Sequence, residues 1–144
     1  VSDTSRMRLA GCLRAMQRSG IRGPVARESA LYSYEGGYLT TQRILAAGAP
    51  ITALFAMADV MAIGAARAVR DAGKRIPEDI SLIGFDGLPI CRYYEPRLST
   101  VTQQIAFMAE KSYAVLLDMI ENGSGAQHVL APYTLEKTDS IRKN

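Results

Sequence analysis

The sequence predicts an α/β fold built on a parallel sheet flanked by helices. Two compact apolar runs, at 51–57 and 80–85, have the length and character of buried strands. Helical patterns alternate with them, and each helical pattern closes at a glycine. Strands that alternate with helices are typical of βαβ units, and such strands are apolar throughout because helices cover both faces of the sheet.

The first half of the chain contains two predicted helices on either side of a weaker strand. Residues 5–19 place their apolar side chains on one helical face and stop before Gly20. Residues 24–31 form the weaker strand candidate. Ser33 is positioned to cap a second helix, which closes at Gly48.

The second half repeats the alternation with stronger signals. The strand at 51–57 precedes a helix over 60–72, for which Asp59 is a suitable N-cap. Pro77 then interrupts the chain before the next strand. The remaining predicted elements are a strand at 80–85, a long helix at 105–121 and an extended segment at 127–135.

Polar and aromatic residues follow three of the predicted strands at the points where the strands end. These residues are Tyr32, Asp59 and Asp86. Ligands of open α/β sheets bind just beyond the carboxyl ends of the strands, where a carboxylate can accept bonds from ligand hydroxyls. Both acids also have an ordinary explanation, Asp86 as a turn residue that caps Gly87–Leu88 and Asp59 as a helix N-cap.

Composition places the chain among ordinary globular proteins. It has 144 residues, of which 48% are hydrophobic and 22% are charged, so it is one soluble domain or a large piece of one. The net charge is +3, and the densest basic region is spread along residues 6–22. This spread fits a solvated helix face better than a nucleic-acid surface, which needs more charge and a reader motif.

The sequence offers little for catalysis, metal binding or membrane insertion. Its single histidine, His128, excludes a multi-histidine metal site and a plausible Ser-His-Asp triad. Cys12 and Cys91 lie far apart without metal-like spacing, which fits a reducing cytoplasm. Gly36–Gly37 is too short for a phosphate loop, and no apolar run is long enough to cross a membrane. We therefore expect a cytoplasmic protein that is not an enzyme and has no cofactor or metal.

A long stretch of the sequence resembles a known family. FAMADVMAIGAARAVRDAGKRIPEDISLIGFDGLPICRYYEPRLSTVTQQ is similar to the effector-binding region of LacI/GalR-type bacterial transcription regulators. The resemblance extends upstream through SRMRLAGCLRAM and SYEGGY, and downstream to HVLAPYTLEKTDS. It covers nearly the whole chain, and its order and spacing agree over about fifty residues without a gap.

The resemblance implies a type I periplasmic-binding-protein-like fold, in which two subdomains flank a cleft that binds a small molecule. The chain would be mostly the C-terminal subdomain, comprising residues 1–98 without their first strand. Residues 99–126 would be a hinge strand and a helix of the N-terminal subdomain, and 127–144 a return strand and tail. We expect the chain alone to be poorly stable or to associate, because it would leave backbone groups and an apolar helix face unpartnered.

The resemblance also implies partners. The effector would be a sugar or a similar molecule, or a nucleobase, and the protein would be a homodimeric repressor. Operator DNA would be bound through a helix-turn-helix head that this chain does not contain. The alternative is a periplasmic sugar-binding protein of a transporter, which shares the fold but would carry a signal peptide.

Five effector-binding positions carry over from the family pattern. Arg8 matches an arginine that binds effector hydroxyls or carboxylates, and Asp86 matches an acid that accepts bonds from the ligand. Tyr32 matches an aromatic residue that stacks on a ring, and Thr4 a hydroxyl residue at the pocket edge. Ala58 stands where the family has asparagine. A solvated helix position remains the alternative for Arg8, as does plain core packing for Tyr32.

Two further features follow from the resemblance. The second acid of the family's Asp-Asp pair is Gly87 here, so the ligand preference is expected to differ from that of other members. Three residues, Ile63, Tyr93 and Tyr94, fall where relatives form their subunit interface. The alternative for the two tyrosines is packing on their own domain.

Overall fold

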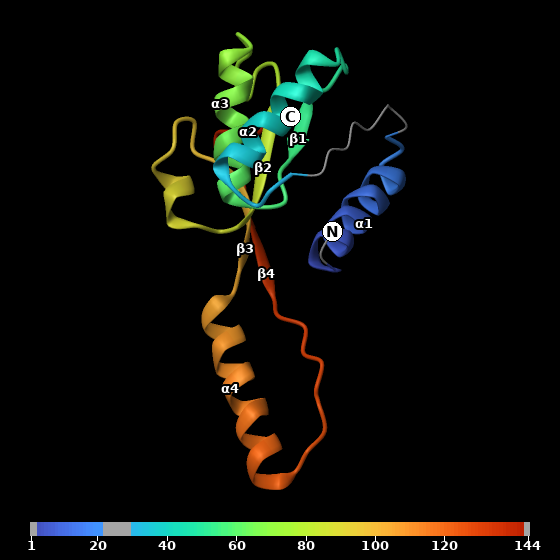
Figure 1. The fold of residues 1–144 in the computed structure, drawn as a ribbon, viewed down its shortest axis with the longest axis vertical. Helices are drawn as coiled ribbons and strands as arrows, with labels where there is room; N and C mark the ends of the chain where they lie inside the picture. Colours follow the sequence, from blue (N-terminus) through green and yellow to red (C-terminus); the bar gives the residue numbers. More distant parts are fainter. Residues whose placement is uncertain (1–2, 22–29, 143–144) are drawn as a thin grey trace.

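The computed structural model describes residues 3–21 and 30–142, and it contains one four-stranded sheet (Figure 1). The strands lie in the order β1-β2-β3-β4. The first three strands are parallel, and β4 pairs with β3 in the antiparallel sense. Their bounds are Ala53–Phe55 for β1, Ser81–Asp86 for β2, Ser99–Gln103 for β3 and Tyr133–Glu136 for β4.

Four α-helices and one short 3-10 helix accompany the sheet. Their bounds are Asp3–Arg18 for α1, Tyr34–Ala46 for α2, Asp59–Asp71 for α3, Pro89–Arg92 for the 3-10 helix η1 and Ile105–Asn122 for α4. In Figure 1, α2 and α3 lie together beside β1 and β2, and α1 stands on the other side of β1. The helix α4 extends away from this body below β3 and β4, and in the described part of the chain it buries none of its residues.

The predicted α/β fold is confirmed, with three differences in detail. The strand predicted over 51–57 is shorter, since only Ala53–Phe55 pairs with β2. The final strand is also shorter than the extended segment predicted at 127–135, and it makes the sheet mixed rather than purely parallel. The strand candidate at 24–31 falls largely on residues 24–29, which lie outside the described residues.

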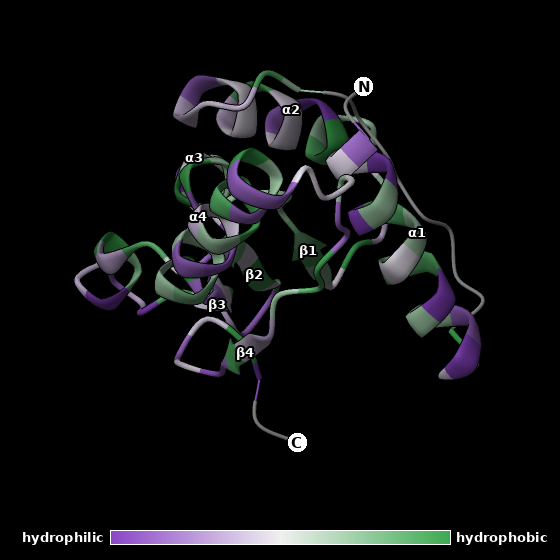
Figure 2. Cartoon of the chain, turned by 90° about the horizontal axis from the view of Figure 1, so that it is seen from below, coloured by the Kyte–Doolittle hydropathy of each residue, from purple (hydrophilic) through white to green (hydrophobic). Residues whose placement is uncertain are grey.

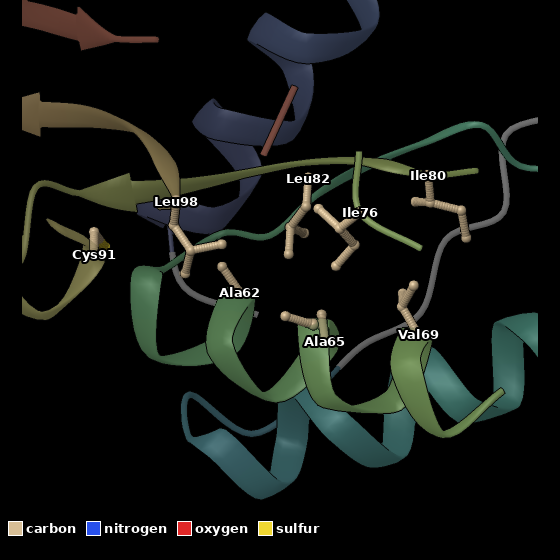
Figure 3. Close-up of a cluster of buried hydrophobic side chains, with 9 residues drawn as sticks. Ala62, Ala65, Val69, Ile76, Ile80, Leu82, Cys91 and Leu98 are labelled. Carbon is tan, nitrogen blue, oxygen red and sulfur yellow. The ribbon is translucent and has the colours of Figure 1, made fainter. Parts of the chain in front are cut away.

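The core lies between α3 and the sheet (Figure 3). The helix presents small side chains to it, namely Ala62, Ala65, Ala66 and Val69, each at most 3% exposed. Larger side chains from the sheet side fill the space opposite, namely Ile76, Ile80, Leu82, Cys91 and Leu98. Because alanine carries a single methyl group, α3 packs close to β2, and this closeness brings the helix N-terminus to the strand ends.

Glycines set the distance between α2 and α3. A Cβ atom at Gly64 of α3 would lie 2.0 Å from the carbonyl oxygen of Tyr34, and one at Gly37 of α2 would lie 2.2 Å from that of Met61. The two backbones therefore touch where the helices cross. The Gly36–Gly37 pair, too short for a phosphate loop, has this packing role instead: a Cβ at Gly36 would lie 2.1 Å from the carbonyl oxygen of Leu31.

Ser140 in the C-terminal tail joins the starts of β2 and β3. Its hydroxyl donates to the Leu82 carbonyl oxygen at 2.6 Å and accepts from the Ser99 amide at 2.8 Å. Its backbone carbonyl accepts from the Leu82 amide at 2.7 Å, and its amide donates to the carbonyl of Arg97 at 3.0 Å. The residue is completely buried. It therefore completes the backbone hydrogen bonding where the two strands separate.

Ser140→Ala should lower the unfolding free energy of the full-length protein by about 2–4 kcal/mol, because it leaves the Leu82 carbonyl and the Ser99 amide buried without that partner. Urea unfolding followed by circular dichroism measures the loss. Ser19→Ala is the control, since Ser19 is exposed after α1 and its replacement should change the unfolding free energy by less than about 0.5 kcal/mol. Equal effects of both substitutions would contradict the role assigned to Ser140.

Candidate functional site

The carboxyl end of β2 delivers an acid in an unusual backbone conformation. Asp86 is the last residue of β2 and has a φ of 126°. A positive φ is rare for residues other than glycine. It costs on the order of 1–3 kcal/mol and persists only where the surrounding structure imposes it. The next residue, Gly87, has a φ of 82°. The chain thus turns sharply after β2 and points the Asp86 carboxylate along the strand-end edge of the sheet.

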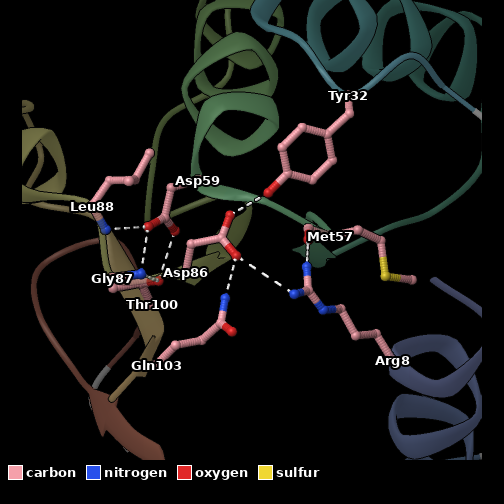
Figure 4. Close-up of polar contacts among 9 residues, drawn as sticks. All are labelled: Arg8, Tyr32, Met57, Asp59, Asp86, Gly87, Leu88, Thr100 and Gln103. Carbon is pink, nitrogen blue, oxygen red and sulfur yellow. Dashed lines mark hydrogen bonds and ion pairs between the residues drawn. The ribbon is translucent and has the colours of Figure 1, made fainter. Parts of the chain in front are cut away.

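Three side chains from distant parts of the sequence converge on that carboxylate, and we refer to the four residues together as the Asp86 cluster (Figure 4). Gln103 at the end of β3 donates to Oδ1 at 2.8 Å, and an Arg8 nitrogen lies 3.5 Å from the same oxygen. The Tyr32 hydroxyl donates to Oδ2. Both oxygens of Asp86 therefore have partners contributed by α1, by the segment before α2 and by β3.

Arg8 is held firmly in the Asp86 cluster. Its side chain is only 15% exposed, and its guanidinium also donates to the carbonyl oxygen of Met57 beyond β1. The guanidinium carbon lies 3.7 Å from the centre of the Phe85 ring, which favours a cation–π contact. Arg8 is thus no ordinary solvated helix arginine. A fixed planar fork of donors next to a carboxylate suits recognition of hydroxyl or carboxylate oxygens.

Tyr32 is exposed on its outer side, with 62% of the residue accessible. It is therefore not a core packing residue. Burial of the hydroxyl end, reinforced by the hydrogen bond to Asp86, raises the pKa of Tyr32 above its ordinary value. The Tyr32 hydroxyl therefore acts as a hydrogen-bond donor to Asp86, while its ring remains available to a ligand.

The other two predicted effector positions lie nearby but differ in character. Thr4 is exposed on α1, one helical turn before Arg8 and on the same face. Ala58 is completely buried and is the N-cap of α3, without a side-chain cap hydrogen bond. The prediction that Asp59 is the N-cap is therefore wrong. The cap is Ala58, and Asp59 begins the helix with its carboxylate turned to other partners.

Asp59 forms a second polar cluster beside the first (Figure 4). Its carboxylate accepts hydrogen bonds from the Thr100 hydroxyl at 2.6 Å, from the Gly87 amide at 2.8 Å and from the Leu88 amide at 2.7 Å. Asp59 has no exposed surface. Burial, with a further contribution from Asp59, raises the pKa of the Cys91 thiol to about 12, so this cysteine is an inert core residue.

Sequence reasoning missed Gln103, and it named Asp59 as a strand-end residue but explained it as a helix N-cap. The helix-cap pattern gave Asp59 a complete local explanation, and Gln103 carried no signal except its place in the Thr-Val-Thr-Gln run. The structure also gives a reason for Gly87, where the family pattern has an acid. A Cβ there would lie 2.5 Å from the Thr102 side chain, and the φ is positive.

The three predicted interface residues lie outside the Asp86 cluster. Ile63 is half-buried against the core, and Tyr93 after η1 is 84% exposed. Tyr94 packs against the core, accepts a hydrogen bond from Arg70 and stacks beneath its guanidinium at 5.2 Å. Tyr94 thus packs on its own domain, while Tyr93 remains accessible.

Other kinds of site find no support in the described ranges. No group of three or more metal-ligating side chains occurs there, and none of the described helices is long and apolar enough to span a bilayer. A hollow at the opposite end of β2 is lined by Pro77, Glu78, Asp139, Ile141 and Arg142. Arg142 donates there to the carbonyls of Pro77 and Glu78, so the tail forms one wall of this hollow.

Comparison with known proteins identifies the family. A model described as a periplasmic binding protein-like domain matches residues 1–141. The chain belongs to this family. Its curated relatives place this periplasmic-binding-protein-like chain in the LacI group, because they include the regulator MalR of Clostridium butyricum and the repressor PurR of Escherichia coli. Each is 38% identical, over 76% and 83% of this chain respectively.

Solved structures agree with this assignment. A lac repressor dimer bound to operator and an anti-inducer superimposes with a TM-score of 0.89 at 30% identity, covering 96% of this chain and 48% of that one. A LacI-family regulator from Enterococcus faecium with bound ribose superimposes with a TM-score of 0.81 at 33% identity, covering 93% and 50%. The predicted type I periplasmic-binding-protein-like fold is therefore confirmed.

The chain spans only part of these relatives, namely 32% of MalR and 36% of PurR. Both relatives are named as transcription regulators, as the sequence predicted. This supports the regulator over the transport protein that was the alternative. Figure 2 shows hydrophobic and hydrophilic residues mixed along the helices, including α1 and α4.

Proposed function

We propose that this chain is the effector-sensing part of a cytoplasmic, homodimeric LacI-type regulator, and that the Asp86 cluster binds the effector. The observation that carries the proposal is the Asp86 cluster itself. A carboxylate and a guanidinium, each with a side chain at most 16% exposed, lie at the strand-end edge beneath an exposed tyrosine ring. A fixed acceptor, a fork of donors and one flat apolar face suit a polyhydroxylated ring such as a sugar.

The proposed division of the chain explains how binding would be transmitted. Residues 1–98 form the C-terminal effector subdomain, 99–126 supply a hinge strand and a helix to the N-terminal subdomain, and 127–144 return as a strand and tail. The isolation of α4 supports this division, since six of its large apolar residues are exposed; they are Ile105, Met108, Tyr113, Leu116, Met119 and Ile120. Gln103 joins the effector acid directly to the end of β3.

DNA binding and dimerisation belong to the same proposal. A helix-turn-helix head elsewhere in the full-length protein contacts operator DNA, and the effector favours one orientation of the two subdomains, which sets the spacing of the paired heads. Tyr93, exposed after η1, is the residue best placed for contact with a second copy. Ile63 and Tyr94, the other two predicted interface residues, are partly buried against the core.

The test is binding of candidate effectors to the full-length protein by isothermal titration calorimetry. The panel contains ribose, an o-nitrophenyl galactoside, a nucleoside and a nucleobase, with mannitol as an acyclic polyol control. We expect at least one ring compound to bind and to change the affinity for operator DNA measured by fluorescence anisotropy. Failure of every ring compound to bind would contradict a sugar-like or nucleobase effector, and binding without any effect on DNA would contradict the regulatory role.

Tyr32→Phe should raise the affinity for hydroxylated effectors by about fivefold to tenfold, as measured by calorimetry. The Tyr32 hydroxyl donates to Oδ2 of Asp86, and an effector hydroxyl must compete with it for this acceptor. Removing the Tyr32 hydroxyl leaves the acceptor free for the effector, so the binding free energy gains roughly the contribution of one hydrogen bond. The ring that stacks on the ligand is kept. Tyr34→Phe is the matched control, since Tyr34 is comparably exposed and should leave affinity unchanged. A weaker effector affinity in Tyr32→Phe would show that the phenol binds the ligand instead.

A further inference from the structure

Asp59 is a completely buried acid whose carboxylate is engaged by three elements of the fold. It begins α3. Its carboxylate accepts hydrogen bonds from two backbone amides of the turn after β2 and from the hydroxyl of Thr100 on β3. The same hydroxyl lies 3.3 Å from the Gly87 amide, which donates to it as well. Burying a carboxylate is expensive, and three donors within 2.8 Å offset that cost.

The neighbouring strand is shaped to admit this carboxylate. A Cβ atom at Gly84 of β2 would lie 2.3 Å from Oδ1 of Asp59, so only glycine leaves the required space. Gly84 precedes Asp86 by two residues on the same strand. The space for the Asp59 carboxylate and the position of the effector acid are therefore set by one short segment, Gly84–Leu88.

The bonds to Asp59 act on the turn that contains the left-handed residues. Asp86 and Gly87 have φ values of 126° and 82°, and the amides of Gly87 and Leu88 follow immediately. Both amides point at one oxygen of Asp59. A turn clamped in this way cannot relax to an ordinary extended conformation at Asp86 without breaking two charge-assisted hydrogen bonds.

We infer that Asp59 is a positioning residue for effector binding, which holds the strained turn after β2 so that Asp86 faces Arg8, Tyr32 and Gln103. The inference rests on the proposed function in that Asp86 is taken as an effector ligand. Asp59 itself does not touch the effector, because it is buried. Through Thr100 it also ties the orientation of Asp86 to β3, the strand that supplies Gln103.

The experiment compares conservative and disruptive substitutions in the full-length protein. Asp59→Asn can still accept both amides through its carbonyl oxygen while its amide donates to Thr100, so it preserves the turn. Asp59→Ala removes the acceptor. Thr100→Ser keeps the hydroxyl, whereas Thr100→Val removes it at nearly constant shape and provides a milder variant if Asp59→Ala does not fold.

Two readouts decide the inference. Crystal structures of Asp59→Ala or Thr100→Val should show Asp86 with a changed φ and without its bond to Gln103, whereas Asp59→Asn and Thr100→Ser should retain both. Calorimetry with ribose should give a dissociation constant at least about tenfold higher for the disruptive variants and within about threefold for the conservative pair, tenfold being about 1.4 kcal/mol. A purely structural role would lower the melting temperature of the folded variants and leave the ribose dissociation constant alone.

The outcomes separate this inference from the proposed function. If the wild-type protein does not bind ribose, that ligand is wrong, and the Asp86 geometry in the variant structures still decides the positioning role. An unchanged φ and an intact Asp86–Gln103 bond in the disruptive variants would overturn the inference. If the wild-type protein binds ribose, a disruptive variant in which Asp86 is displaced without any loss of ribose affinity would overturn it as well.

Discussion

Gly64→Ala should lower the unfolding free energy of the full-length protein by about 3–5 kcal/mol, a large fraction of the roughly 5–15 kcal/mol by which ordinary proteins are stable. The added methyl carbon would lie 2.0 Å from the Tyr34 carbonyl oxygen and 2.9 Å from the Tyr38 amide nitrogen. Both are backbone atoms of α2, so no rotamer change relieves the overlap. The two helices must separate, which opens the core between α3 and the sheet.

The matched control for this prediction is Gly11→Ala in α1. Gly11 also lies inside a helix, but apart from its chain neighbours and the adjacent backbone of its own helix, no heavy atom of the described residues lies within 4 Å of its added Cβ. Alanine has the higher helix propensity, so this variant should be stabilised by about 0.5–1 kcal/mol. Thermal and urea unfolding measure both. If Gly64→Ala were as stable as Gly11→Ala, α2 and α3 could not approach as closely as described.

Asp86→Asn should weaken binding of whichever ring compound the wild-type protein binds by about 30-fold to 100-fold, with loss of its ligand-induced rise in melting temperature. Asparagine tolerates the positive φ and keeps the side-chain shape. It loses the charge that orients Arg8 and that accepts ligand hydroxyls, and such charge-assisted bonds contribute about 2–3 kcal/mol. Calorimetry supplies the affinity and differential scanning fluorimetry the shift.

Asp71→Asn controls for the general loss of one negative charge. Asp71 is on α3, accepts hydrogen bonds from Arg67 and Tyr38, and lies outside the Asp86 cluster. The Arg67 guanidinium beside it lowers the pKa of its carboxyl below the usual range. Its replacement should leave effector affinity unchanged. Unaltered affinity in Asp86→Asn, or equal losses in both variants, would remove Asp86 from the effector site.

The sequence predicted the parts of the fold that depend on local patterns. Apolar periodicity and terminal glycines located α1, α2, α3 and α4 within a few residues, because burial of one helix face repeats every turn. Strand length was less accurate, since only pairing with a neighbour decides where a strand ends. The antiparallel pairing of β4 with β3 had no local signal at all.

The residues of the candidate site likewise fall into those that the sequence could indicate and those that depend on long-range packing. Arg8, Tyr32 and Asp86 could be named from a family resemblance, and they meet in space. Gln103 and the role of Asp59 could not be predicted, because their contacts join residues 17 to 41 positions apart and depend on how β2, β3 and α3 pack. A sufficient local explanation, such as that of an acid at the start of a helix, can hide the long-range contacts of the same residue.

The seating of Ser140 between β2 and β3 sets an order of events during synthesis. Four backbone and hydroxyl bonds at the base of the two strands need a residue that leaves the ribosome 41 positions after Ser99. Translation adds about 5–20 residues per second, so β2 and β3 emerge several seconds before their junction can close. A nascent or prematurely terminated chain therefore displays open strand ends, and these distinguish it from a finished chain for chaperones and proteases.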